Sequence, residues 1–152
     1  FDVLLAKARA AEDVKEQRDL YYALAGTLDP QLAARALAET LRPGLDTSFQ
    51  VRLMRQVGYA HPVLTRAFLQ REAGKLLANR PPQERAEAVT AAYHGFFDEA
   101  AAAELMAYGQ RTLPAEAQQE IRKAATRIRG DAAERARLVP AFDAWARPEA
   151  KK

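Results

Sequence analysis

Proline and glycine interrupt a chain that otherwise consists of strong helix formers, and this pattern constrains the fold more than any other feature. Eight Pro and seven Gly separate stretches rich in Ala, Leu, Arg, Glu and Gln, which have high helix propensity. Val and Ile are sparse and nowhere alternate with polar residues, so no β-strand is predicted. The sequence therefore predicts an all-α fold.

The spacing of the breakers predicts how the helices are arranged. After a first helix through Ala10, each further stretch has room for two helices or one long helix; these stretches are 14–42, 46–79, 83–109 and 114–147. Their length of roughly 30 residues is typical of helical-repeat proteins, and short connections favour antiparallel neighbours. We expect residues 1–152 to form a single helical domain, an α-α superhelix or HEAT-like array of about eight to ten antiparallel helices.

Capping residues predict where helices start, and glycines predict where they end. Starts are expected at Asp29-Pro30, at Asp46 or Thr47, at His61-Pro62, at Asp98 and at Pro114. Ends are expected at Gly26, Gly58, Gly95 and Gly109. A separate final segment is expected after Gly130-Asp131, with an interruption at Pro140 and with Trp145 fastening the segment to the core.

The ends of the sequence suggest a piece of a longer protein. The chain begins with Phe1 rather than Met, and its first residues already follow a helical pattern. We expect a piece of a longer protein, with a polar, fraying end over 146–152. No signal peptide is expected. The cytoplasm and the periplasm both remain open as compartments.

Several kinds of chemistry are excluded by composition or lack a motif. The chain holds no Cys, which excludes disulfides, thiolate zinc sites and a cysteine nucleophile. No apolar run approaches ~18 residues, so no membrane span is expected. His61 and His94 do not form a His-Glu-x-x-His motif. His94 and Asp98 lie four residues apart, but we favour a surface or capping histidine over a partial metal site.

Other residue types also favour structural roles. Ser48 is the single serine and lies at a predicted helix start, without a Gly-x-Ser-x-Gly context. The carboxylate pairs Glu84 with Glu87 and Asp98 with Glu99 fit the N-termini of helices. The glycines stand singly, so no phosphate-binding loop is predicted. We assign no catalytic, cofactor-binding or metal-binding residue to this chain.

Positive charge gathers toward the C-terminus. The formal net charge is +3, and residues from Arg111 onward hold ten basic and six acidic side chains. This pattern fits an anionic partner, such as nucleic acid or a peptide carboxylate, or a solvated face. We favour the solvated face, because no aromatic residues interleave with the basic ones as nucleic-acid binding requires. Of the pairs Tyr21-Tyr22 and Phe96-Phe97, one member each is expected to face inward.

The order of several segments resembles one known family. Residues 18–30 (Arg-Asp-Leu-Tyr-Tyr-Ala-Leu-Ala-Gly-Thr-Leu-Asp-Pro) resemble a helix junction in the C-terminal helical domain of aminopeptidase N-type zinc metallopeptidases, which include the puromycin-sensitive and endoplasmic-reticulum enzymes. Further similar segments follow in the family's order at 45–50, 61–81, 95–98 with Glu104-Leu105, and 121–145. The chain departs from the family in one helix. The family's long middle helix commonly holds tryptophans, whereas this chain has Arg66 and Ala73 at the matching positions.

The resemblance implies that residues 1–152 are a non-catalytic domain, the C-terminal fragment of a larger multidomain enzyme. In this family the C-terminal helical domain covers the active site of an upstream catalytic domain and helps control peptide access and positioning. Zinc is then expected in the parent enzyme and in no residue of this chain. The expected partners are the upstream catalytic domain and the peptide substrate, with no nucleic acid and no membrane.

One alternative from a different functional class stays open. The chain fits a free-standing helical-repeat scaffold that binds a protein partner through its concave face. An upstream His-Glu-x-x-His in the reading frame would favour the peptidase, whereas a start codon near Phe1 would favour the scaffold. A nucleic-acid-binding helical domain ranks third, and it predicts binding that falls steeply with salt.

Overall fold

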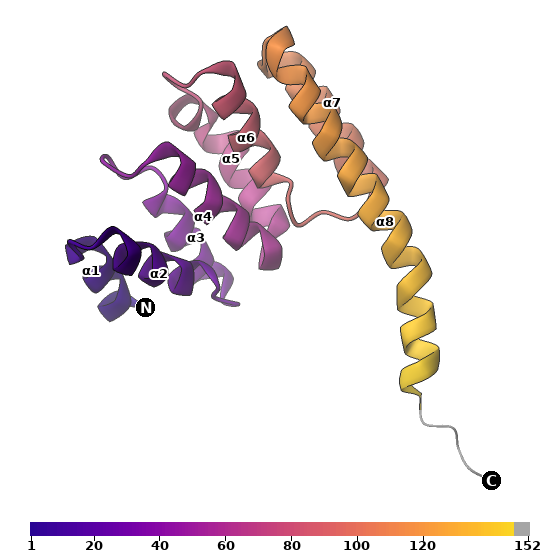
Figure 1. The fold of residues 1–152 in the computed structure, drawn as a ribbon, viewed down its shortest axis with the longest axis horizontal. Coiled ribbons are helices and arrows are strands. Elements are labelled where there is room, and N and C mark those ends of the chain that lie inside the picture. The colour runs from indigo at the N-terminus through magenta and orange to yellow at the C-terminus, as the bar shows by residue number, and fades with distance from the viewer. Residues whose placement is uncertain (148–152) are drawn as a thin grey trace.

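The computed structural model describes residues 1–147, and this range contains helices and no strand (Figure 1). The elements are α1 (Asp2–Ala10), α2 (Val14–Ala25), α3 (Pro30–Glu39), α4 (Thr47–Ala60), α5 (Pro62–Leu76), α6 (Pro82–Ala92), α7 (Glu99–Thr112), the short 3-10 helix η1 (Ala115–Ala117) and α8 (Gln118–Ala146). The all-α prediction is confirmed. The end of the chain that was predicted to fray falls mainly on 148–152, outside the described residues.

The helices are arranged in two layers. One layer is formed by α2, α4, α6 and α8, each of which contacts the next (Figure 1). Behind it, α3 packs against α5, and consecutive helices also pack against each other. This is the predicted HEAT-like array of helices.

Four aspartates fix the starts of four helices. In each case a side-chain oxygen accepts a backbone N–H of the first turn, which satisfies a donor that the helix leaves unpaired. The distance between Oδ1 of the aspartate and the backbone nitrogen is 2.7 Å for Asp13 and Glu16, 2.7 Å for Asp29 and Gln31, 3.0 Å for Asp46 and Phe49, and 2.7 Å for Asp98 and Ala101. The starts predicted at Asp29, Asp46 and Asp98 are confirmed.

Two glycines that were predicted to end helices lie inside helices. Glycine also allows close approach between segments. The helix α4 continues past Gly58 to Ala60, and α7 continues past Gly109 to Thr112. A Cβ at Gly109 would lie 2.8 Å from Cγ2 of Ile121 on α8, and one at Gly95 would lie 2.9 Å from the carbonyl carbon of Gly58. Neither Gly58 nor Gly109 ends its helix, and Gly109 serves helix packing instead.

The long C-terminal helix contradicts the predicted break. The helix α8 runs 29 residues, through both Gly130 and Pro140. Gly130 has no neighbour that forces a turn, and the surrounding Ala- and Arg-rich sequence sustains the helix despite the hydrogen bond that Pro140 removes. Trp145 is 79% exposed, so the prediction that it fastens this segment to the core is also wrong.

Gly95→Ala is expected to destabilise the fold by about 3 kcal/mol or more, because the added methyl group meets the backbone of Gly58 and no side chain can give way. Gly130→Ala is the matched control, since its Cβ enters open space and Ala favours the helix by about 1 kcal/mol. Urea unfolding followed by circular dichroism measures both. Equal stability of the two variants would show that the close contact at Gly95 does not exist.

Candidate functional site

The structure does not bring the residues considered in the sequence together into a catalytic or metal site. Nε2 of His61 lies 2.9 Å from the carbonyl oxygen of Thr27. This contact links the connection between α4 and α5 to the connection between α2 and α3. The Ser48 hydroxyl donates to Asp46 at 2.5 Å at the start of α4. Within residues 1–147, no three His, Asp or Glu side chains are placed to hold a metal ion, and no helix is long and apolar enough to cross a membrane.

Glu84 and Glu87 line a small cavity of about 180 Å³ together with Arg80. Arg80 is only 7% exposed, and burial lowers the pKa of its guanidinium. Its Nη2 donates to Gln50, while its Nη1 has no partner. The nearby Glu84 carboxylate stabilises this buried cation. The two carboxylates outnumber the one guanidinium in the lining, so the cavity does not favour an anion.

A partly exposed carboxylate ties three segments together. Glu104 on α7 accepts hydrogen bonds from Arg66 at 2.5 Å, from Gln70 at 3.0 Å and from the Tyr93 hydroxyl at 3.2 Å. Burial and the adjacent carboxylate raise the pKa of Tyr93 above its ordinary range. The Arg66 guanidinium also lies 5.0 Å from the centre of the Phe96 ring. This network fixes α7 on α5 and the end of α6, a structural task.

The strongest candidate for recognition is a polar patch around His94, which follows α6. His94 packs edge-on against Tyr59 of α4, with ring centres 4.6 Å apart. Its Nδ1 is buried and has no hydrogen-bond partner, and the same is true of Nε of Arg55 on α4. Arg127 on α8 lies near enough to act on its charge. We call Arg55, Tyr59, His94 and Arg127 the polar floor.

The electrostatics of the polar floor keep His94 neutral. Burial, together with the positive charges of Arg127 and Arg55, lowers the pKa of His94 to about 4, against a smaller opposing effect of Asp131. At neutral pH the polar floor therefore carries two guanidinium groups and an uncharged imidazole. Such a surface attracts an anionic group, above all a carboxylate that guanidinium can bind with paired hydrogen bonds.

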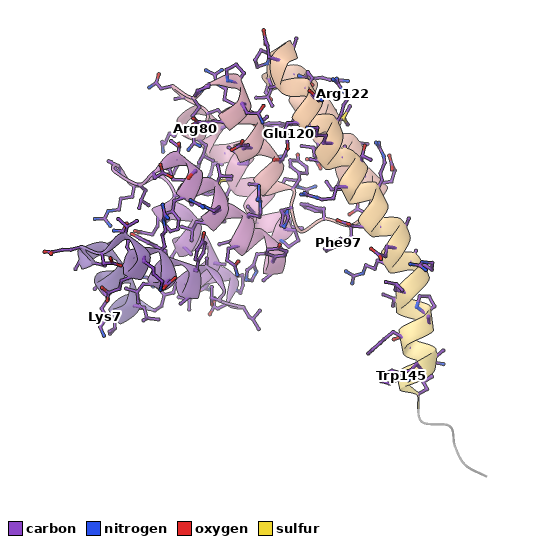
Figure 2. All side chains as sticks on the ribbon, viewed as in Figure 1. Lys7, Arg80, Phe97, Glu120, Arg122 and Trp145 are labelled. Atoms are coloured by element: carbon purple, nitrogen blue, oxygen red, sulfur yellow. The ribbon has the colours of Figure 1, made fainter. Side chains whose placement is uncertain are left out.

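An apolar groove along α8 includes Asp131, whose charge also acts on His94 of the polar floor. The groove has a volume of about 400 Å³ and is lined by Phe97, Asp131, Glu134, Arg135, Leu138 and Val139. Phe97 comes from the connection between α6 and α7 and faces α8 (Figure 2). The guanidinium of Arg135 lies 5.4 Å from the centre of the Phe97 ring. The groove thus joins an apolar wall to a charged rim.

The paired aromatics divide as predicted for one pair and partly for the other. Phe96 is buried and Phe97 is 39% exposed, so Phe97 is free to line the groove. Tyr21 is buried, but Tyr22 is also partly covered and packs edge-on against Phe49 at 5.6 Å. Sequence reasoning did not consider Arg55 and did not single out Arg127 among the C-terminal basic residues, since nothing in their spacing separates them from the many other arginines.

Comparison with models of protein families, with curated proteins and with solved structures finds no match to this chain. What this surface does must therefore be argued from the geometry of the chain itself.

The low pKa of His94 predicts a specific pH dependence of stability. The unfolded chain binds a proton near the ordinary histidine pKa of about 6.5, whereas the folded chain binds it only near pH 4. The stability that the neutral His94 gives is therefore present above pH ~6.5 and is lost as the pH falls from there toward 4. His94→Gln removes this contribution.

The measurement is the free energy of unfolding near pH 7 and near pH 5, for the original chain and for His94→Gln. The original chain should lose more stability between the two pH values than the variant does. An NMR titration of the His94 ring should show its midpoint near pH 4. A midpoint close to 6.5, with identical pH profiles for both chains, would show that His94 is not held in this environment.

Proposed function

We propose that this chain is a non-catalytic helical domain of a zinc aminopeptidase, which covers the active site of a separate catalytic domain and helps to position the peptide substrate. The sequence resemblance described above supports this proposal, and the helical array is consistent with it. The observation that carries it is the polar floor, where two guanidinium groups flank a neutral histidine at the edge of an apolar groove.

The polar floor suits the end of a peptide that lies far from the scissile bond. A peptide's terminal carboxylate would meet Arg127, which is exposed, and Arg55, which is partly buried. Charge-assisted hydrogen bonds of this kind are stronger than neutral ones. Tyr59 is also exposed, and its ring offers an apolar surface to a peptide side chain. Closure of such a domain over a bound peptide would exclude water and hold the peptide in place.

The zinc ion and the acid–base residues of such an enzyme belong to its catalytic domain, and we assign none of them to this chain. Its contribution is binding and orientation. The helical array gives the polar floor a rigid support, because its residues come from α4, α8 and the segment after α6, whose helices pack against one another.

A second function is favoured by a different observation. The C-terminal half of α8 exposes large apolar side chains, which is typical of a surface that binds another protein. This exposure fits a free-standing helical-repeat scaffold. The reading frame separates the two proposals, since an upstream His-Glu-x-x-His supports the peptidase and its absence supports the scaffold.

The isolated chain, supplied with zinc, is expected to release no measurable reporter from aminoacyl substrates. The reason is that the proposed function places the metal and the acid–base chemistry in another domain. A fluorogenic aminoacyl assay, with the same chain treated with a chelator as the control, measures this. Zinc-dependent turnover by this chain alone would refute the proposal.

Within the complete enzyme, Arg127→Gln is expected to raise the KM for peptides by about tenfold, the loss of one charge-assisted hydrogen bond. The kcat for a single-residue aminoacyl reporter should not change, because that substrate has no distal carboxylate. Arg122→Gln is the control, since Arg122 is an exposed arginine on the same helix (Figure 2). Equal KM values for the two variants would remove the polar floor from peptide binding.

A further inference from the structure

The helix α8 carries apolar residues on one face in both of its halves, separated by Asp131 and Arg135. In its first half, Ile121, Ala124, Ala125 and Ile128 are buried against the body of the protein. Fourteen residues further on, two full heptads, the same positions are Arg135, Leu138, Val139 and Phe142, followed by Trp145 one heptad after Leu138. This spacing places all of them on one face of the helix, as in a coiled coil.

Only the first half of this face is covered. The helix α7, which packs against α8, has 14 residues and a length of about 21 Å, whereas α8 has 29 residues and extends about 43 Å. Beyond the body, Phe142 is 63% exposed and Trp145 is 79% exposed, with Leu138 and Val139 about half exposed. Figure 2 shows Trp145 far from the other helices. We call Leu138, Val139, Phe142 and Trp145 the exposed stripe.

The chain itself offers a place for such a stripe to bind. The groove between Phe97 and α8 has an apolar wall and a volume of about 400 Å³, enough for an indole ring. We propose that a second copy of this chain pairs antiparallel with α8, so that Trp145 of each copy enters the groove of the other. The exposed stripe and the groove lie on the same face of α8, so a single contact with two-fold symmetry places each stripe in the groove of the other copy.

The register follows from coiled-coil packing. An antiparallel pair centred near Pro140 sets Leu138 opposite Phe142 of the partner subunit, and Arg135 opposite Trp145 of the partner subunit. Arg135 already lies over one aromatic ring, that of Phe97. In the dimer its guanidinium would also attract the indole ring of Trp145 of the partner subunit. Both contacts occur twice, because the pairing is symmetric.

Charge favours a second copy over a strongly charged partner. Residues 131–147 hold three acidic side chains (Asp131, Glu134, Asp143) and three basic ones (Arg135, Arg137, Arg147). Two such helices do not repel each other, and in the antiparallel register Glu134 lies near Arg147 of the partner subunit. This segment has no net positive charge that would attract a nucleic acid or a uniformly acidic protein.

The size of the contact predicts a weak dimer. Buried aromatic side chains contribute roughly 150–250 Å² each, and each copy brings Phe142 and Trp145, both already more than half exposed. With Leu138 and Val139 added, the total is on the order of 1,000 Å², the lower end for specific interfaces. We therefore expect association at micromolar to submillimolar concentrations, without any peptidase substrate.

Trp145 is the single tryptophan of the chain, so its fluorescence reports directly on the proposed contact. The intact chain is measured from about 1 µM to about 1 mM, by fluorescence and by sedimentation in parallel. The expected result is a concentration-dependent blue shift of the emission together with a twofold rise in mass. A monomer with the emission of a water-exposed indole at every concentration would overturn the proposal and leave the exposed stripe to a different partner.

Variants keep the test independent of folding. Leu138→Glu alters a half-exposed residue of the stripe, and it should weaken the dimer at least about tenfold while the helical circular dichroism is unchanged. Val63→Glu is the matched control, since Val63 is equally apolar and 61% exposed on α5, and it should leave the dimer intact. A dimer that loses stability with Val63→Glu but survives Leu138→Glu uses another surface, which also refutes the proposal.

Phe97→Ser tests the groove without altering α8. The substitution removes the apolar wall, so it should weaken the dimer and reverse the blue shift of Trp145. Phe97 lies outside α8, the helix that carries Trp145. An unchanged blue shift in Phe97→Ser would show that Trp145 does not enter the groove. None of these measurements uses catalysis, so their outcome is separate from that of the aminopeptidase proposal.

Discussion

The packing of the first half of α8 on the body determines most of what is distinctive in this protein. Ile121 sits against Gly109 of α7, where no side chain larger than hydrogen fits, and Ile128 is fully buried. Dense packing of this kind leaves a helix little freedom to change direction. The second half of α8 is therefore directed away from the other helices, and the groove and the exposed stripe follow from its position.

The fold class and several helix starts could be predicted from the sequence because both depend on local physics. An aspartate before an apolar stripe caps a helix whatever surrounds it, as Asp29 and Asp98 show. Glycine is different, since it serves both as a helix end and as a site of close packing. Gly109 proved to be a packing site, and only the position of another segment reveals this.

The site was less accessible to sequence reasoning, for a related reason. Arg55, His94 and Arg127 stand far apart in the chain, and the helical array brings them together. The error over Trp145 has the opposite cause: a tryptophan is usually covered in a monomer, but here the helix that carries it leaves the body. One available signal was the return of apolar residues in the same heptad phase on both sides of Gly130, from Ile121 to Ile128 and again from Leu138 to Phe142.

The central claim is that α8 is one continuous helix that carries the exposed stripe beyond the body. Residual dipolar couplings of its backbone amides, with nuclear Overhauser effects of the Trp145 indole, test this most directly. The structure requires one helix axis from Gln118 to Ala146 and no indole contact with core side chains of the same chain such as Phe96. Two axes that meet at Gly130, with Trp145 folded back onto the core, would contradict it.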